Sequence, residues 1–372
     1  MAAKILILSA SVGAGHLRAA QALENAFTQH GATVRNIDIL TLTSDLFKKA
    51  YSKTYMELVN RAPHVVGYFY DLTDKPANPG KDGLRALVQK INLKPVQTII
   101  ASQPWDCIVS THFLPADLIA TMRRTKKSTQ KHVTVVTDFD AHALWVNQPC
   151  DRYYVATEDA AASLQHWGVP IGDISTTGIP IMPAFSSAMT RDAAKKKLEY
   201  APARPVILLL GGGFGLGPIE RAYNQLLTMQ TPVQITVICG KSTELKEKLE
   251  KIIVPPRLKA NIVGFTPHID EYMRSADIVV TKPGGLTSAE SLACGAAVAI
   301  MNPIPGQESR NSDYLLENGA AIKINSIATM ATKIERLLKD QDKLNNLRKN
   351  ALVLAKPKAA TEICESVLAM CK

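Results

Sequence analysis

Short apolar runs alternate along this chain with segments whose apolar residues recur at helical spacing. The first half carries the runs KILILSA, DCIVSTH and HVTVVTDF, and the second half carries PVILLLGGG, QITVICG, DIVVTKPG and AAVAIMN. Strands that alternate with helices are typical of β-α units around a parallel sheet. The pattern therefore predicts an α/β fold in two halves, each built on its own parallel sheet.

A proline-rich stretch separates the two halves. Residues 176–205 read TTGIPIMPAFSSAMTRDAAKKKLEYAPARP and contain one short helical segment, which is typical of a linker. We place the domain boundary at residue 185, so that the N-terminal domain comprises residues 1–185 and the C-terminal domain residues 186–372. The final stretch, residues 340–372, is helical with a break at Pro357, and these last helices can pack back on the N-terminal domain.

Composition narrows the class of protein. The length of 372 residues suits two domains with separate cores, and six scattered cysteines without a C-x-x-C pair favour reduced thiols. The first residues lack the pattern of a signal peptide, and no apolar run approaches the roughly 18 residues that span a bilayer. We therefore expect a soluble or peripheral protein. A formal net charge of +10 favours an anionic partner, which is nucleic acid, an anionic lipid surface or a nucleotide.

Three glycine-rich loops follow predicted strands: SASVGAGH, GGGFGLGPIE (211–220) and TKPGGLTSAESLACG (281–295). Open parallel sheets bind ligands at the carboxyl ends of their strands. Glycine lets backbone amides approach a phosphate there, and the helix that follows adds the positive end of its dipole. Each loop alone is equally well explained as a simple turn. The first loop has neither the Walker pattern nor G-x-G-x-x-G, which disfavours a P-loop NTPase or a dinucleotide site.

Glu290 has two explanations from its local sequence. Thr287-Ser288-Ala289-Glu290 has the spacing of a capping box, in which the glutamate accepts a hydrogen bond from a backbone N–H at the start of a helix. In nucleotide sites an acidic residue instead accepts both hydroxyls of a ribose. Spacing alone leaves the two open.

Five motifs resemble one family in the same order. They are SVGAGH, VVTDFDAHALW, TTGIPIMPAF, GGGFGLGPIE and TKPGGLTSAESLACGAAVAIMNPIPGQESRNSDYLLENGAA. The chain resembles the monogalactosyldiacylglycerol synthases and bacterial diacylglycerol glucosyltransferases of glycosyltransferase family 28. The resemblance implies a GT-B fold, in which two Rossmann-like domains face a cleft. It also implies inverting transfer of glucose or galactose from a UDP-sugar to diacylglycerol, giving a β-linked glycolipid. No metal and no cofactor besides the UDP-sugar is expected.

The same resemblance assigns the donor-binding residues. Glu290 falls where the family holds the ribose, and Lys282 is the basic side chain expected near the diphosphate. Gln307, Glu308 and Asn311 match the segment that contacts the sugar hydroxyls, although a polar helix start after Pro305-Gly306 also explains them. The glycines expected around the donor are Gly15, Gly211, Gly212, Gly213, Gly215, Gly284 and Gly285.

Inversion by direct displacement needs a base that takes the proton of the acceptor hydroxyl. His16 lies at the end of the first glycine loop and aligns with the family's histidine, and an imidazole has a pKa suited to the task. The alternative is that it only caps or braces the loop. Asp138, which matches the family's aspartate, is either a competing base or the group that orients His16. His112 and His142 are further candidates.

The N-terminal domain also carries the expected acceptor and membrane contacts. In residues 47–62 a helical projection gathers Phe47, Tyr51 and Tyr55 on one side, beside a polar arc that contains Lys, Arg and Glu side chains. Such a helix docks on an anionic membrane or packs on its own sheet. Residues 123–132 form a second basic cluster, and His112 and Trp145 are assigned to the acceptor side. The expected partners are a UDP-hexose, diacylglycerol and an anionic membrane surface, without nucleic acid. We expect a cytoplasmic protein that associates peripherally with the inner face of the cell membrane.

Two rival functions stay open at this stage. One is a GT-B transferase that acts on another lipid-linked or soluble acceptor, such as a polyprenyl-linked sugar. The other is a UDP-sugar-binding or epimerase-like protein without transfer, for which UDP release would not depend on an acceptor.

Overall fold

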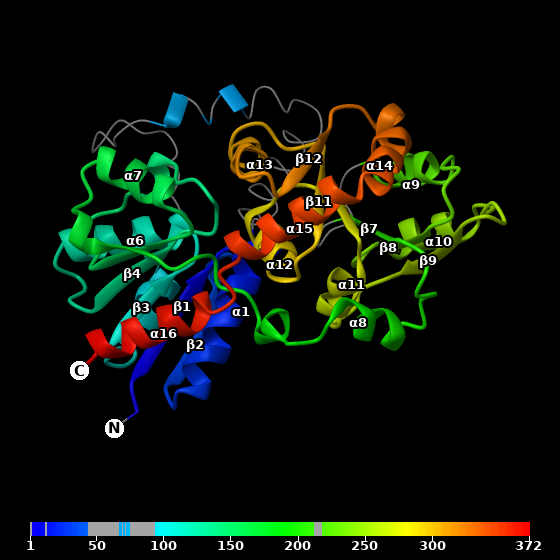
Figure 1. Ribbon diagram of the computed structural model, residues 1–372. Helices are drawn as coiled ribbons and strands as arrows, with labels where there is room; N and C mark the ends of the chain where they lie inside the picture. Colours follow the sequence, from blue (N-terminus) through cyan, green and yellow to red (C-terminus); the bar gives the residue numbers. More distant parts are fainter. Residues whose placement is uncertain are drawn as a thin grey trace. The chain divides into compact units, whose positions relative to one another are not determined.

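The computed structural model describes residues 2–11, 13–43, 67–68, 70, 72–74, 94–211 and 218–372. The chain forms two compact units (Figure 1). The first unit comprises Met1–Met182, Ile304–Arg310 and Lys356–Lys372, and the second comprises Pro183–Pro303 and Asn311–Ala355. The first unit thus includes Ile304–Arg310, which interrupts the second unit in sequence, and Lys356–Lys372, which follows it.

In the described part of the first unit, six parallel strands form a sheet in the order β2-β1-β3-β4-β5-β6. The strands are β1 (Lys4–Ser9), β2 (Thr33–Asp38), β3 (Cys107–Ser110), β4 (Lys131–Val135), β5 (Arg152–Val155) and β6 (Ile174–Thr176). The helices are α1 (Ala14–Gln29), α5 (Lys94–Ala101), α6 (Phe113–Arg124), α7 (Glu158–His166) and α16 (Ala359–Met370).

The alternation of side chains along β1 explains how this sheet is covered. Ile5 and Ile7 face the cluster that includes residues of α1 and α16, whereas Leu6 and Leu8 face residues of α5 and α6. Because successive side chains point to opposite faces of a strand, a continuous apolar run fits a strand that is buried on both faces. The C-terminal helix α16 therefore completes the core of the first unit.

The second unit repeats this design among its described residues, with parallel strands in the order β12-β11-β10-β7-β8-β9. The strands are β7 (Val206–Leu210), β8 (Gln234–Ile238), β9 (Lys259–Val263), β10 (Ile278–Thr281), β11 (Ala297–Met301) and β12 (Ala321–Ile324). The helices are α8 (Arg191–Lys197), α9 (Ile219–Leu226), α10 (Thr243–Glu250), α11 (Ile269–Ser275), α12 (Gly285–Ala293), α14 (Met330–Lys339) and α15 (Gln341–Leu354); α13 (Gln307–Glu317) runs from one unit into the other.

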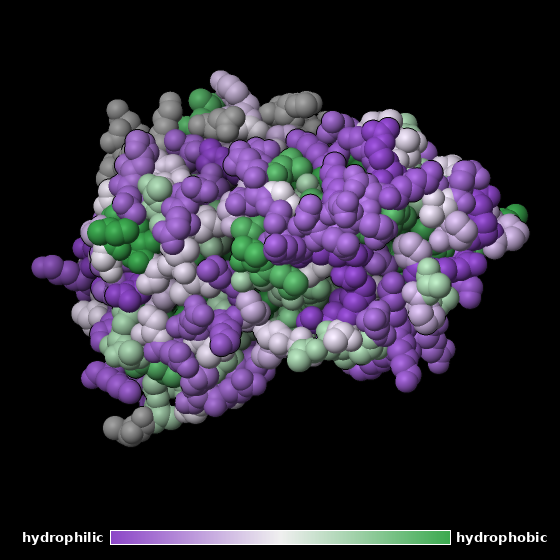
Figure 2. Space-filling model, viewed as in Figure 1, coloured by the Kyte–Doolittle hydropathy of each residue, from purple (hydrophilic) through white to green (hydrophobic). Residues whose placement is uncertain are grey.

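The helices of the second unit bury one side and expose the other. Leu344, Leu347 and Ala351 of α15 are buried, while most of the positions between them are exposed. Figure 2 shows a mainly hydrophilic surface over α14 and α15. The prediction of two α/β halves with parallel sheets is confirmed. Among the helices that the structure describes, none combines the length and apolar character needed to cross a bilayer.

Candidate active site

His16 lies in the first turn of α1, the helix that follows β1. Its Nδ1 is 3.0 Å from the carbonyl oxygen of Thr111 and 2.9 Å from the hydroxyl oxygen of Thr137. Thr111 follows β3 and Thr137 follows β4, and these strands succeed β1 in the sheet order. The carboxyl ends of parallel strands share one edge of a sheet, so three loops that are distant in sequence converge on this imidazole.

These partners determine which nitrogen of His16 carries the proton. A carbonyl oxygen only accepts hydrogen bonds, so Nδ1 carries the hydrogen and donates it to Thr111, with the Thr137 hydroxyl oxygen as a second acceptor. Nε2 then holds the lone pair. Desolvation of the ring lowers the pKa of His16 to about 4, against the opposing effect of the hydrogen bond to Thr111. At neutral pH the side chain is therefore an uncharged imidazole that accepts a proton at Nε2.

His112 and His142 both cap helices. Nδ1 of His112 accepts a hydrogen bond of 3.0 Å from the backbone N–H of Leu114 at the start of α6. Nδ1 of His142 does the same for Leu144 in the short helix Ala143–Trp145, and its Nε2 donates to the carbonyl oxygen of Tyr70 over 2.8 Å. Burial lowers the pKa of His112 well below its usual value, and repulsion between the two rings when both are protonated lowers it further. Their place at helix starts gives both histidines a structural task.

The rings around His16 form an apolar wall. The rings of His16 and His112 meet edge to face with centroids 4.5 Å apart, and the Trp145 ring centroid is 6.2 Å from that of His16. Trp145 is only 3% exposed and packs in the core with Val136 and Tyr153. A residue so buried does not contact a membrane surface. Its contact with an acceptor stays a prediction.

Asp138 lies in the loop after β4 and accepts a hydrogen bond from Nε2 of Gln307. Two residues later, Asp140 forms an ion pair of 3.2 Å with Arg310, which is three residues after Gln307. A helix places residues three apart on the same side, so the 138–140 loop and the first turn of α13 meet at two matched points. This arrangement holds Gln307 against Asp138 within the first unit.

Arg310 also joins this loop to the segment around Tyr70. Its guanidinium forms an ion pair with Asp74 and lies over the Tyr70 ring, with Cζ 5.1 Å from the ring centroid. Asp74 in turn accepts a hydrogen bond of 3.0 Å from the backbone N–H of Ala143. A planar guanidinium suits this task because it binds two carboxylates and stacks on a ring at the same time.

Glu308 closes the first turn of α13. Its Oε2 accepts a hydrogen bond of 2.8 Å from the backbone N–H of Ile304. α13 begins at Gln307, directly after Pro305-Gly306. The segment is therefore the polar helix start that was the alternative explanation for these residues. Asn311 is fully buried. Contact of Gln307, Glu308 and Asn311 with a sugar stays a prediction.

In the second unit, Lys282 and Gly284 follow β10 and lead into α12. Gly284 is the N-cap of α12, and a Cβ at this position would meet none of the described atoms within 4 Å. Open space therefore lies beside the start of the helix. The positive end of the helix dipole and the first backbone N–H groups of α12 favour an anion there, and Lys282 adds a positive charge.

The capping-box explanation of Glu290 is wrong. The N-cap of α12 is Gly284, three residues before Thr287, so Glu290 lies within the helix instead of at its third position. The side chain is 1% exposed. Since the local explanation fails, the ribose contact is the remaining prediction for Glu290.

The other predicted residues fall into two groups. Gly15 lies in the first turn of α1, and the N–H of Gly211 after β7 donates to Ile238 over 3.2 Å; Gly285 is the first residue of α12. The second group lies outside the described residues: Gly212, Gly213, Gly215, Phe47, Tyr51 and Tyr55. In the part of the chain that the structure describes, no group of three or more His, Cys, Asp or Glu side chains is arranged to hold a metal ion.

Sequence reasoning missed Thr111, Thr137, Asp140 and Arg310. Thr111, Thr137 and Asp140 share one signal, because each stands within five residues after the end of a strand, at the ligand-binding edge of the sheet. Arg310 gives no such signal, since only the folded chain brings it to Asp140.

Comparison with known proteins now identifies the family. Residues 16–181 match the family model described as monogalactosyldiacylglycerol (MGDG) synthase, and residues 219–353 match the model described as glycosyl transferases group 1. The processive diacylglycerol beta-glucosyltransferase of Bacillus subtilis (strain 168) is 30% identical over 370 residues, which cover 98% of this chain and 94% of that protein. The chain belongs to the monogalactosyldiacylglycerol synthase and diacylglycerol glucosyltransferase family. A second member, from Bacillus pumilus (strain SAFR-032), is 30% identical with the same coverage.

Solved structures support the fold class. MurG of Acinetobacter baumannii superimposes with a TM-score of 0.67 at 15% identity, and the match covers 99% of both chains. Anabaena Alr3699/HepE in complex with UDP matches with a TM-score of 0.56 at 14% identity, over 98% of this chain and all of that one. At such low identity the likeness concerns the fold alone. The fold is α/β of the GT-B class, with two Rossmann-like parallel sheets, as the family resemblance implied.

Proposed function

We propose that this protein transfers a hexose, with inversion, from a UDP-sugar to the free hydroxyl of diacylglycerol and so makes a β-glycosyl diacylglycerol. The match over nearly the full length of relatives named processive diacylglycerol beta-glucosyltransferase supports this donor and acceptor, and favours glucose as the hexose. The rival functions become outcomes of the test below.

One observation carries the mechanism: His16 is held as a neutral imidazole whose lone pair is on Nε2. In the proposed step, Nε2 takes the proton of the acceptor hydroxyl while that oxygen forms a bond to the anomeric carbon of the hexose. The bond from the anomeric carbon to the UDP oxygen breaks, and UDP leaves with the electron pair. A single displacement inverts the configuration at this carbon.

We propose that residues of the second unit stabilise the leaving UDP. Lys282 and the start of α12 are the positive groups that follow β10, and we propose that they bind the diphosphate. With these groups in place of a bound cation, transfer is expected to need no metal. Activity that persists after dialysis against EDTA supports this proposal, and activity that returns only on addition of Mg²⁺ or Mn²⁺ overturns it.

We further propose that the protein works at the anionic inner face of the cell membrane. Exposed cations support this: Arg124, Lys126 and Lys127 lie at or just beyond the end of α6. Arg124 also pairs with Asp117 over 4.0 Å, and Arg123 donates two hydrogen bonds of 2.8 and 2.9 Å to Asp151. Co-sedimentation with vesicles of anionic or neutral lipid tests the proposal. Changing Lys126 and Lys127 to Gln should weaken binding to anionic vesicles only.

The function itself is tested with purified protein and diacylglycerol in anionic and in neutral micelles. UDP-glucose and UDP-galactose are supplied in parallel, and both the glycolipid and the released UDP are measured. A β-glucosyl diacylglycerol is the expected product. If no glycolipid forms under any condition, the proposal fails. Release of UDP that does not depend on diacylglycerol points to one of the rival functions.

A further inference from the structure

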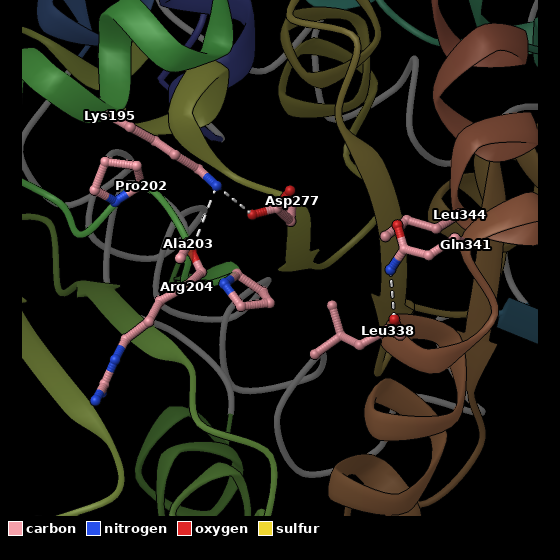
Figure 3. Close-up of a pocket in the computed structure, with 9 residues that line it drawn as sticks. Lys195, Pro202, Ala203, Arg204, Asp277, Leu338, Gln341 and Leu344 are labelled. Carbon is pink, nitrogen blue, oxygen red and sulfur yellow. Dashed lines mark hydrogen bonds and ion pairs between the residues drawn. The ribbon is translucent and has the colours of Figure 1, made fainter.

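A cavity of about 160 Å³ lies in the second unit, away from the loops discussed above (Figure 3). One side is polar and is formed by Lys195 of α8 and by Asp277, the residue before β10. Arg204 and Gln341 add further polar groups, while Pro202, Pro205, Leu338 and Leu344 supply most of the apolar part of the lining. The cavity therefore combines charged and polar groups with an apolar surface.

The charged wall carries more positive than negative charge. Asp277 accepts a hydrogen bond of 2.9 Å from Nζ of Lys195 and forms ion pairs with Arg348 and, over 3.8 Å, with Arg191. Three cations thus surround one carboxylate, which leaves this cluster a formal surplus of two positive charges; Lys195 lines the cavity, and Arg191 and Arg348 lie behind it on Asp277. Lys195 is 7% exposed and Asp277 is 8% exposed, so water screens this wall poorly.

Lys195 keeps donor capacity toward the cavity that it lines. Besides Asp277, its Nζ donates to the carbonyl oxygen of Arg204 over 3.4 Å, and both contacts are drawn in Figure 3. An ammonium group has three N–H donors, and these two contacts use two of them. A ligand oxygen in the cavity would accept a hydrogen bond from the third N–H of Lys195.

The cavity is separate from the expected donor site. Pro205 directly precedes β7 and Asp277 directly precedes β10, so the cavity lies at the amino ends of these strands. Gly211 and Lys282 follow the same two strands at their carboxyl ends. Five residues of β7 span roughly 17 Å at about 3.3 Å per residue. One ligand of small size cannot occupy both places.

We propose that this cavity binds a phosphate monoester with a small apolar body. A phosphate monoester carries nearly two negative charges at pH 7, which matches the surplus of two positive charges. Its oxygens accept the third hydrogen of Lys195, and Leu338, Leu344 and the two prolines cover its apolar body. Binding joins α8 to α14 and α15, and it stabilises the second unit by mass action.

Phenyl phosphate is a suitable probe, and its binding is measured by titration calorimetry in the presence of saturating UDP. We expect phenyl phosphate to bind more tightly than benzoate, which has one charge, and phenol not to bind. If benzoate binds more tightly than phenyl phosphate, the proposal that the cavity prefers a doubly charged ligand is overturned. If UDP abolishes binding of phenyl phosphate, the probe occupies the donor site, and the proposal of a separate site is overturned.

Variants on the same elements supply the controls. Lys195→Met should weaken binding of phenyl phosphate at least about tenfold, since a charge-assisted hydrogen bond is lost. Lys197→Met removes the same charge from the same helix, but Lys197 pairs with Glu271 over 2.9 Å, and binding should not change. Equal binding by both variants overturns the proposal.

If Lys195→Met does not fold, a second variant tests the proposed site. Gln341 is exposed in the first turn of α15 and also lines the cavity. Gln341→Glu loses the hydrogen bond that Nε2 donates to the carbonyl oxygen of Leu338, but it places a negative charge where the helix dipole favours it, so we expect the variant to fold while the probe is repelled. Phenyl phosphate should bind this variant several times more weakly, and unchanged binding overturns the proposal.

Discussion

Nδ1 of His16 lies 3.0 Å from the carbonyl oxygen of Thr111, although 95 residues separate them in the chain. The contact joins the loop after β1 to the loop after β3 and fixes the ring proton on Nδ1. The same threonine returns a hydrogen bond, because its hydroxyl donates to the carbonyl oxygen of His16 over 3.1 Å. These two bonds hold both the backbone and the ring of His16, so the orientation of Nε2 is built into the sheet edge.

His16→Ala should lower turnover by about two orders of magnitude or more, because the proton of the acceptor then lacks a positioned base. The affinity for UDP should change little, since UDP carries no acceptor hydroxyl. Turnover is measured as glycolipid formed per second at saturating donor and acceptor, and UDP affinity by calorimetry.

His16→Asn is the matched variant for this prediction. The asparagine amide can donate to Thr111 as Nδ1 does, but it cannot take up a proton. We expect it to retain the melting temperature of the parent protein and to share the loss of turnover. Turnover near that of the parent in either variant removes His16 from the mechanism.

The pH dependence of kcat/KM should report the low pKa of His16. The base acts in its neutral form, so kcat/KM should stay level as the pH falls through 6.5 and decline only near pH 4, where the imidazole becomes charged. A decline centred near pH 6.5 contradicts the desolvated environment described for His16. The measurement requires a check by circular dichroism that the protein is still folded at the lowest pH.

The strands show how far the sequence predicts the fold. β7, β10 and β11 are buried along their whole length, so they appear as continuous apolar runs. β2 and β9 lie at the edges of their sheets and alternate exposed with partly buried residues, and neither gave an apolar run. Edge strands are less buried, so apolar runs alone do not reveal them.

The residues of the site also divide into those that could be predicted from the sequence and those that could not. Residues of the glycine loops and His16 could be found from sequence because they follow strongly predicted strands. The pairing of Arg310 with Asp140 could not, because it joins residues 170 positions apart and depends on the register of two loops. Glu290 was ambiguous for a further reason: its capping spacing is real, but α12 starts three residues earlier than that spacing requires.

Gly284→Ala should weaken UDP binding about tenfold without destabilising the protein. The backbone of Gly284 has φ −67° and ψ 139°, which alanine adopts readily, and a Cβ there meets none of the described atoms within 4 Å. Replacing glycine by alanine at such a position typically stabilises by about 0.4–1 kcal/mol. The new methyl group, however, occupies space beside the start of α12, where the diphosphate is expected. UDP affinity and the melting temperature are measured together.

Gly172→Ala is the control for that variant. A Cβ on Gly172 likewise meets no described atom within 4 Å, but this residue lies in a short helix at Ile171–Asp173 of the first unit, far along the chain from the glycine loops. It should leave UDP affinity unchanged. If Gly284→Ala also binds UDP like the parent, the diphosphate does not lie at the start of α12.

Arg310→Met should raise the KM for UDP-glucose about tenfold while the inhibition constant of UDP stays the same. Arg310 holds the first turn of α13 to Asp140 and Asp74, and Gln307 in that turn is expected to contact the hexose. Loss of the ion pairs releases Gln307 from its place beside Asp138, at a cost of roughly 1.5–3 kcal/mol for charged hydrogen bonds. UDP lacks the hexose, so it does not sense this change. The contrast between the two constants separates misplacement of the sugar contact from general loss of the donor site.

Two further variants sharpen this test. Arg310→Lys should restore little, because one ammonium cannot bridge two carboxylates and stack on the Tyr70 ring as the guanidinium does. Arg221→Met removes the same charge from an exposed position on α9 and should alter neither constant. An equal rise in the inhibition constant of UDP for Arg310→Met would mean that the residue supports the whole donor site. The paired contacts at Asp138 and Asp140 would then have no specific part in holding the sugar.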